Sequence, residues 1–181
     1  MTNEDNGQNP EKNPGKYVRK RSAIEQAYKL ISYQPRTEYQ IRSILERLGY
    51  SHEEIAEASE RLVEAEAIDD KKYAERYLEI LIEKKHGRIR ILNDFRRRGI
   101  ETELATETVV QGYSREMERE NAISVTRRMI AERGEVKSRR TLKSKICSKL
   151  VYLGYDYEMA GSVWDEVLSE QYSEEQERED Y

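Results

Sequence analysis

Lysine and arginine are concentrated in two stretches of this 181-residue chain, and their charge and number make these stretches the first candidates for a functional surface. Seven of them lie between positions 84 and 98, where Asp94 is the one acid. Nine more lie between positions 127 and 149, against Glu132 and Glu135. Guanidinium and ammonium groups attract phosphates and carboxylates, so both stretches are candidate surfaces for binding nucleic acid or acidic protein.

The candidate contact surface is drawn from the basic residues of these two stretches. Its members are Lys84, Lys85, Arg88, Arg90, Arg96, Arg97, Arg98, Lys137, Arg139, Arg140, Lys143 and Lys145. A plain alternative is that they form solvated helix faces with acids one turn away. The run from Arg96 to Arg98 has few such acids near it, which favours a binding surface.

Motifs that would indicate catalysis are missing from the sequence. It has no phosphate-binding glycine loop, no HExxH and no GxSxG, and the glycine of Gly87-x-x-x-Ile91 is not followed by GK[ST]. One cysteine and two widely separated histidines make a zinc site improbable. We therefore expect a protein that binds and does not catalyse, with no metal and no cofactor.

Composition excludes a membrane protein and a large β-core. No run approaches the roughly 18 apolar residues of a membrane helix, and the N-terminus has no hydrophobic signal-peptide centre. The single Cys147 cannot form an internal disulfide, which suits a reducing cytoplasm. Charge is abundant, at 38% of residues, yet nearly balanced at a net −4. Modest helical cores with solvated outer faces fit this balance.

Helices must position the basic stretches. The chain has no proline after Pro35, and apolar residues recur at i, i+3, i+4 and i+7 from Ile24, from Ile41 and from Ala74. A further apolar stripe of Leu142, Ile146, Leu150 and Leu153 runs through the second basic stretch. Thr37-x-x-Gln40 and Ser51-x-x-Glu54 both have the sequence of a capping box at a helix start.

A repeat of about 50 residues organises these helices. The segments ILERLGY, FRRRGI and LVYLGY each predict a helix that ends at a glycine, namely Gly49, Gly99 and Gly154. A breaker precedes each of these helices, at Pro35, Gly87 and Gly134, and a short apolar-periodic segment follows each. The sequence thus predicts an all-α fold of about nine helices in three three-helix modules. The expected ranges are a flexible segment 1–15, modules 20–67, 68–113 and 114–170, and an acidic tail 171–181.

The middle of the chain resembles the RecX family, the bacterial regulators of the RecA recombinase. The resemblance lies in residues 68–104, which read IDDKKYAERYLEILIEKKHGRIRILNDFRRRGIETEL, and it extends to residues 37–68 and 153–167. It implies an elongated, curved array of three-helix modules that lies along the RecA filament on DNA. Members of the family suppress the ATPase, strand exchange and co-protease activities of RecA, and so affect DNA repair and the SOS response.

These resemblances and patterns leave more than one function open. The first is a cytoplasmic monomer that represses the RecA filament, with the basic residues contacting the protein or the DNA backbone. The second is a non-enzymatic DNA-binding protein that uses its modules as helix-turn-helix-like readers. A third is a helical scaffold for another partner. Tyr73 and Tyr77 could stack on bases, but core packing is the expected role for them and for Trp164, and an inert thiol is expected for Cys147.

Overall fold

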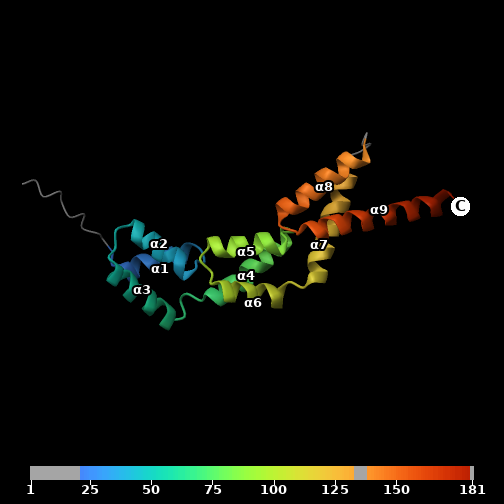
Figure 1. Cartoon of the computed structure of the whole chain (residues 1–181). Helices are drawn as coiled ribbons and strands as arrows, with labels where there is room; N and C mark the ends of the chain where they lie inside the picture. Colours follow the sequence, from blue (N-terminus) through green and yellow to red (C-terminus); the bar gives the residue numbers. More distant parts are fainter. Residues whose placement is uncertain (1–20, 133–137, 180–181) are drawn as a thin grey trace, which may run out of the picture.

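The chain folds into helices joined by short turns (Figure 1). The computed structural model describes residues 21–132 and 138–179, with side chains up to Glu170, and within them it has nine helices and no strand. The helices are α1 (Ala23–Tyr33), α2 (Glu38–Arg47), α3 (His52–Glu64), α4 (Asp70–Glu83), α5 (Arg88–Arg97), α6 (Thr102–Gly112), α7 (Arg115–Ala131), α8 (Arg139–Leu153) and α9 (Tyr157–Glu179).

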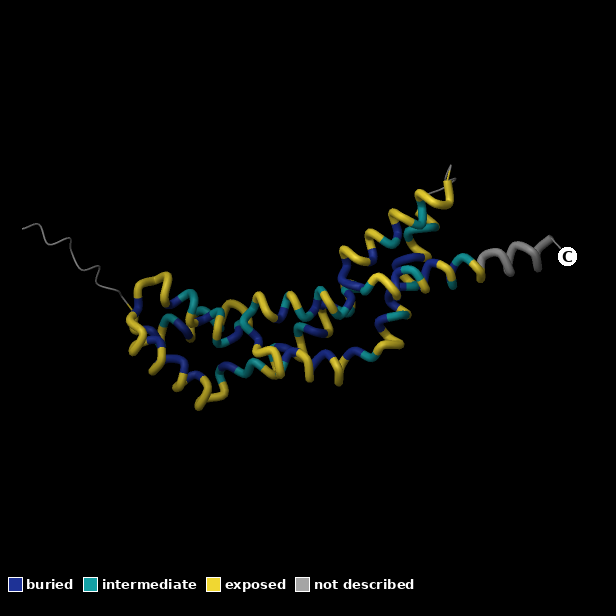
Figure 2. Tube along the Cα trace, viewed as in Figure 1, coloured by how far each residue is buried: buried dark blue, intermediate teal, exposed yellow. Residues whose placement is uncertain are grey.

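Three separate cores hold these helices together. The first lies among α1, α2 and α3 around Ile41, Leu45 and Leu62, and the second among α4, α5 and α6 around Ile91 and Phe95. The third gathers apolar side chains of α7, α8 and α9, and Trp164 is 2% exposed there. All extensive helix pairing falls within one of these triplets. The predicted all-α tandem array of three-helix modules is confirmed, and it is elongated and curved (Figures 1 and 2).

The expected module limits stay predictions at the level of single residues. The flexible segment predicted for residues 1–15 lies outside the described residues, as does the breaker Gly134. Helix α9 continues to Glu179, within the range that the sequence assigns to an acidic tail.

Local sequence explains where the helices begin. Thr37 accepts a hydrogen bond from the backbone N–H of Gln40, while the Gln40 side chain accepts one from the N–H of Thr37. Ser51 and Glu54 form the same reciprocal pair, so both predicted capping boxes are confirmed. A third capping box, between Ser22 and Glu25, starts α1 and escaped the sequence analysis.

The three aligned glycines end their helices in the same way. Gly49, Gly99 and Gly154 have φ angles of 80°, 74° and 94°, in the left-handed region that glycine adopts without a Cβ clash. In each case the N–H of the next residue bonds back to a carbonyl five positions earlier, as Tyr155 does to Leu150 at 3.1 Å. The residue after the glycine is buried in its own module, which confirms the repeat inferred from the sequence.

The acidic and the basic stretches of the chain lie on different helices of the array. Figure 1 shows α2, α5 and α8 along one side and α3 and α6 along the other. Exposed glutamates are concentrated on α3, and α6 adds Glu103 and Glu107, whereas most residues of the two basic stretches lie on α5 and α8. The near-neutral net charge of the chain is therefore an average over segments of opposite sign.

Candidate binding surface and module joints

The second and third modules meet through the ends of two helices. The N–H of Gly87, at the start of α5, donates to the carbonyl of Leu153 at 2.9 Å, and the N–H of Ile89 donates to the carbonyl of Gly154 at 3.1 Å. Helix α8 thus ends where α5 begins, and its last carbonyls satisfy amides that have no partner within α5. The backbones approach so closely that a Cβ on Gly154 would lie 2.3 Å from the Cβ of Arg90.

A buried carboxylate completes this joint. Glu118 of α7 is 1% exposed, and it accepts the backbone N–H of Arg88 at 2.8 Å. The Arg88 guanidinium lies 3.5 Å from the same carboxylate, and Arg115 donates to it at 2.8 Å. Arg115 also pairs with Asp156, whose pKa is lowered by the N–H of Met159 and by this arginine. Two cations and one amide therefore compensate the buried charge of Glu118.

Lys85 belongs to the same joint. Its ammonium donates to the side-chain carbonyl of Asn121 at 2.5 Å, and the Asn121 amide donates to the Tyr113 hydroxyl at 3.1 Å. The Tyr155 hydroxyl donates to the backbone carbonyl of Lys85 at 2.9 Å. Burial raises the pKa of both tyrosines, so their hydroxyls stay protonated and available as donors.

The first and second modules meet in an equivalent way. Thr37, which is fully buried at the start of α2, donates its hydroxyl hydrogen bond to the carbonyl of Arg98 at the end of α5, at 2.6 Å. The N–H of Glu38 donates to Asp70 of α4 at 2.9 Å, as the N–H of Arg88 does to Glu118. A Cβ on Gly99 would lie within 2.4 Å of three Tyr39 side-chain atoms. Both joints are thus built from helix ends.

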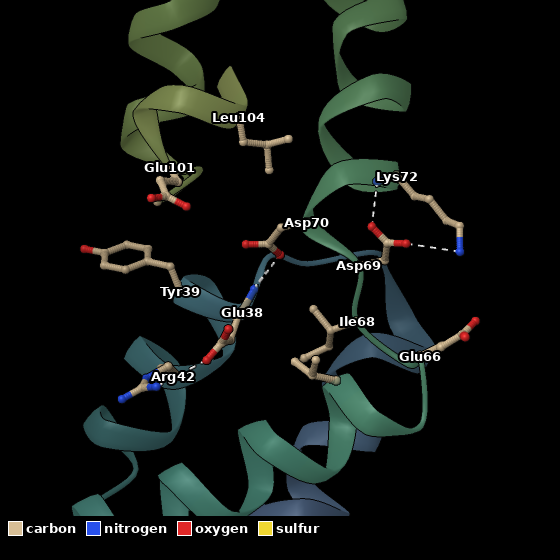
Figure 3. Close-up of a pocket in the computed structure, with 12 residues that line it drawn as sticks. Glu38, Tyr39, Arg42, Glu66, Ile68, Asp69, Asp70, Lys72, Glu101 and Leu104 are labelled. Atoms are coloured by element: carbon tan, nitrogen blue, oxygen red, sulfur yellow. Dashed lines mark hydrogen bonds and ion pairs between the residues drawn. The ribbon is translucent and has the colours of Figure 1, made fainter. Parts of the chain in front are cut away.

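A cleft of about 730 Å³ opens beside the first joint (Figure 3). Asp70 lies beside the start of α2 on its wall and accepts the Glu38 N–H, while the Glu38 carboxylate pairs with Arg42. Burial raises the pKa of Asp70 in spite of this hydrogen bond, and the nearby charges of Glu38 and Asp69 act in the same direction. The cleft is predominantly acidic, because five carboxylates line it against two cations.

The structure describes eleven of the twelve candidate basic residues and divides them into two groups. Lys85, Arg88, Arg90 and Arg98 take part in the joints or contact the neighbouring module. Lys84, Arg96, Arg97, Arg139, Arg140 and Lys145 are exposed, and Lys143 is half-buried and pairs with Asp165 at 2.7 Å. Lys137 lies outside the described residues. The exposed members belong to α5, α8 and the end of α4, so they could reach a partner.

A network that the sequence analysis missed surrounds Arg98. Its guanidinium donates to the Tyr73 hydroxyl at 2.7 Å and to the Tyr77 hydroxyl at 2.9 Å, and it lies 3.9 Å from the centre of the Tyr77 ring. Both tyrosines are half-buried and pack against the second core, as expected. The i, i+4 spacing of the tyrosines was visible in the sequence, but their arginine partner lies 21 residues beyond Tyr77.

The structure also bears on the Cys147 thiol, on metal binding and on membrane insertion. Burial raises the pKa of the Cys147 thiol, although Lys143 acts in the opposite direction, and the inert thiol expected from the sequence stays a prediction. In the part of the chain that the structure describes, no three His, Cys, Asp or Glu side chains are arranged to hold a metal ion. Among the same residues, no helix has the length and apolar character that crossing a membrane requires.

Comparison with known proteins identifies the modules. Residues 23–62 match the family model of the first three-helix domain of RecX, and residues 69–109 match that of the second. "Regulatory protein RecX" of Caldanaerobacter subterraneus is 29% identical over 102 residues, which are 56% of this chain and 52% of that protein. The protein of the same name from Clostridium botulinum is 27% identical over 146 residues, which are 80% of this chain and 68% of that protein. The match thus spans about half of the first relative and about two thirds of the second.

The fold has a close counterpart among solved structures. The crystal structure of RecX from Lactobacillus salivarius aligns with a TM-score of 0.70 at 24% identity, over 80% of this chain and 96% of that chain. The two domain models match in the order that the repeat predicts, and the relatives and the solved structure carry the same family name. This chain therefore belongs to the RecX family.

Proposed function

We propose that this chain binds the RecA filament on DNA and represses its ATPase, strand exchange and co-protease activities. It would thereby limit RecA in DNA repair and in the SOS response. Membership of the RecX family supports the proposal, because regulation of RecA is the role that this family implies. In the proposal the chain acts as a cytoplasmic monomer without a catalytic activity of its own.

The observation that carries the proposal is the exposed basic surface on α5 and α8, together with the shape of the array. Arg96 and Arg97 on α5 and Arg140 and Lys145 on α8 are exposed, and the two helices lie along the same side of an elongated molecule (Figure 1). An array of this kind can contact several positions along a filament, where each contact raises the effective concentration of the next. Its partner would present acidic protein surface or DNA phosphates to these cations.

A titration of the protein into single-strand-DNA-dependent ATP hydrolysis by the cognate RecA tests the proposal. We expect inhibition at near-stoichiometric ratios to RecA protomers, and weaker inhibition by the double variant Arg96→Glu with Arg97→Glu. The matched control is Arg61→Glu with Lys71→Glu, which makes the same change in net charge at exposed positions on α3 and α4. Absence of inhibition by the unaltered protein would overturn the proposal.

The second candidate function is direct DNA binding by the helix-turn-helix-like modules. The exposed cations of α5 and α8 favour it, because neutralisation of phosphates supplies most non-specific DNA affinity. It predicts tight, strongly salt-dependent binding to naked DNA and no effect on RecA. The ATPase titration and a salt series on naked DNA therefore separate the two functions.

A further inference from the structure

A second cleft, of about 480 Å³, lies on the joint between the first two modules, and its lining includes none of the exposed basic residues of α5 and α8. The turn between α1 and α2 forms one wall, and α4 and the end of α5 form the others. Its lining residues are Gln34, Pro35, Gln40, Tyr73, Arg76, Tyr77, Ile80 and Arg98. None of them is acidic, in contrast to the five carboxylates of the cleft in Figure 3.

Arg98 is held in place inside this cleft without being neutralised. Its two bonds go to the Tyr73 and Tyr77 hydroxyls, and the Tyr77 ring lies beneath its guanidinium. A guanidinium has five N–H donors, so donors remain for a ligand after these two bonds. Both hydroxyl acceptors are uncharged, and the positive charge of Arg98 is left for a partner to pair with. The network fixes the geometry before any ligand arrives, which lowers the entropy cost of binding.

Two more arginines add to the positive charge here. Arg76 is exposed and lines the cleft, and within the described residues it forms no hydrogen bond and no ion pair. Arg36 is half-buried, and its Nε has no hydrogen-bond partner among the described residues. Burial raises the pKa of Tyr73, and the positive charge of Arg36 acts in the opposite direction. Planar guanidinium groups of this kind bind carboxylates through two parallel hydrogen bonds. The cleft is therefore suited to an anionic group.

The walls of the cleft favour a protein ligand over nucleic acid. Ile80 is 44% exposed, Pro35 is exposed beside Gln34, and Tyr33 immediately before them is 76% exposed. Apolar and aromatic side chains around a charged anchor are typical of a protein interface. A DNA strand would need a track of cations for successive phosphates. On α2, next to the cleft, the charges Glu38, Arg42, Glu46 and Arg47 alternate and provide no such track.

We propose that this cleft docks an acidic segment of the RecA protomer, with a carboxylate bound by Arg76 and Arg98 and an apolar neighbour packed against Ile80 and Pro35. The inference rests on the proposed function and names a contact that the basic surface of α5 and α8 does not include. Because the cleft is lined by residues of both of the first two modules, binding there also fixes their relative position.

The test compares two equilibrium titrations of the full chain, one with RecA filaments on single-stranded DNA and one with the same DNA free of protein. Arg76→Glu is the test variant, since the exposed Arg76 supports no contact within the described fold. Lys71→Glu is its matched control, because Lys71 is exposed on the same helix but lines a different groove. We expect Arg76→Glu to weaken filament binding by about tenfold or more, which is about 1.4 kcal/mol. Binding to free DNA and the behaviour of Lys71→Glu stay unchanged.

Each contrary outcome identifies what fails. Filament binding by Arg76→Glu equal to that of the unaltered chain overturns the docking site and leaves the proposed function standing. An equal loss on free DNA overturns it in favour of a phosphate ligand. If the unaltered chain does not bind filaments at all, the proposed function falls and this docking site falls with it. A further variant, Arg76→Lys, keeps the positive charge but cannot form the bidentate hydrogen bonds of a guanidinium. We expect its affinity for filaments to lie between those of Arg76→Glu and the unaltered chain.

Discussion

The Glu118 carboxylate of α7 accepts the backbone N–H of Arg88, at the start of α5, at 2.8 Å. Gly87 stands at the N-cap of α5 and has no side chain to cap the helix, so an acid from the next module takes over that role. Asp70 of α4 and the N–H of Glu38 repeat this arrangement one module earlier. The modules are thus joined by polar contacts at helix ends, while each keeps a hydrophobic core of its own.

Removal of the Glu118 carboxylate should destabilise the second joint. We expect Glu118→Ala to lower the free energy of unfolding by about 1–3 kcal/mol, because the backbone N–H of Arg88 would lose its acceptor and the Arg88 guanidinium its charge partner. Urea unfolding followed by far-ultraviolet circular dichroism measures the loss. Glu120→Ala is the control, since Glu120 is exposed on the same helix, and we expect it to change stability little. Equal effects of the two variants would show that the buried ion pairs do not hold the joint.

Substitutions at four glycines allow the cost of a left-handed backbone to be measured separately from the cost of a steric clash. Gly161 lies within α9, has no positive φ, and a Cβ there would meet no atom of the described residues within 4 Å. Gly49 has a φ of +80° with the same free space, whereas Gly99 and Gly154 combine a positive φ with a close neighbour. We expect Gly161→Ala to stabilise the protein by about 0.5–1 kcal/mol, since alanine favours the helix. Gly49→Ala should destabilise it by about 1–3 kcal/mol through the left-handed backbone alone.

The joint glycines should be the more sensitive ones. At Gly154 an added Cβ would lie 2.4 Å from the backbone nitrogen of Arg90, which cannot move without displacing α5. We expect Gly154→Ala to cost more stability than Gly49→Ala and to alter the protein's small-angle X-ray scattering profile. If the two variants lose equal stability and scatter alike, the close approach of α8 to α5 has no energetic role.

Much of the fold could be predicted from short-range patterns. The capping boxes at Thr37 and Ser51 and the left-handed Gly49, Gly99 and Gly154 are set by residues within one or two helical turns, so the sequence displays them directly. The joints could not be predicted in the same way. Glu118 lies 30 residues from Arg88 and looks in the sequence like one more acid on a charged helix. Its burial becomes visible only in the fold, which brings α7 to the start of α5.

The candidate binding surface likewise contains features that the sequence displays and features that only the fold reveals. The basic stretches are visible in the sequence, but nothing local distinguishes the exposed Arg97 from Arg88, which faces a buried carboxylate. Arg76 escaped notice because Glu75 and Glu79 stand beside it in the sequence. On the helix those acids line a groove next to α6, whereas Arg76 lines the cleft with Tyr73 and Tyr77. Charge counted along the chain cannot separate the sides of one helix.

Asp70 should give the protein a distinctive response to pH. Burial raises its pKa in the folded state, so the folded protein holds this proton more tightly than the unfolded chain does. The charged form therefore destabilises the fold above the raised pKa, and this cost disappears as the pH falls through that value. We expect Asp70→Asn to be more stable than the unaltered chain at neutral pH and to lose this advantage at acidic pH. Unfolding by urea across a pH series measures both; an advantage of Asp70→Asn that grows as the pH falls would contradict the assignment.

Replacement of two arginines of the same basic stretch should have different effects: loss of Arg88 should lower stability, and loss of Arg97 should weaken inhibition of RecA. Arg88 is largely covered and lies beside buried Glu118, so Arg88→Ala should lower the free energy of unfolding markedly, by about 3–5 kcal/mol. The Arg97 side chain is 70% exposed, and among the described residues it pairs with Asp94, one turn away. With its cation in solvent, such a pair contributes about 0–1 kcal/mol. We expect Arg97→Ala to unfold like the unaltered protein and yet to inhibit RecA-dependent ATP hydrolysis less at the same concentration. Measured together, urea unfolding and the ATPase titration assign Arg88 to the joint and Arg97 to the partner surface. An Arg97→Ala protein that inhibits fully would remove α5 from that surface, since its exposed cations would then have no role in binding.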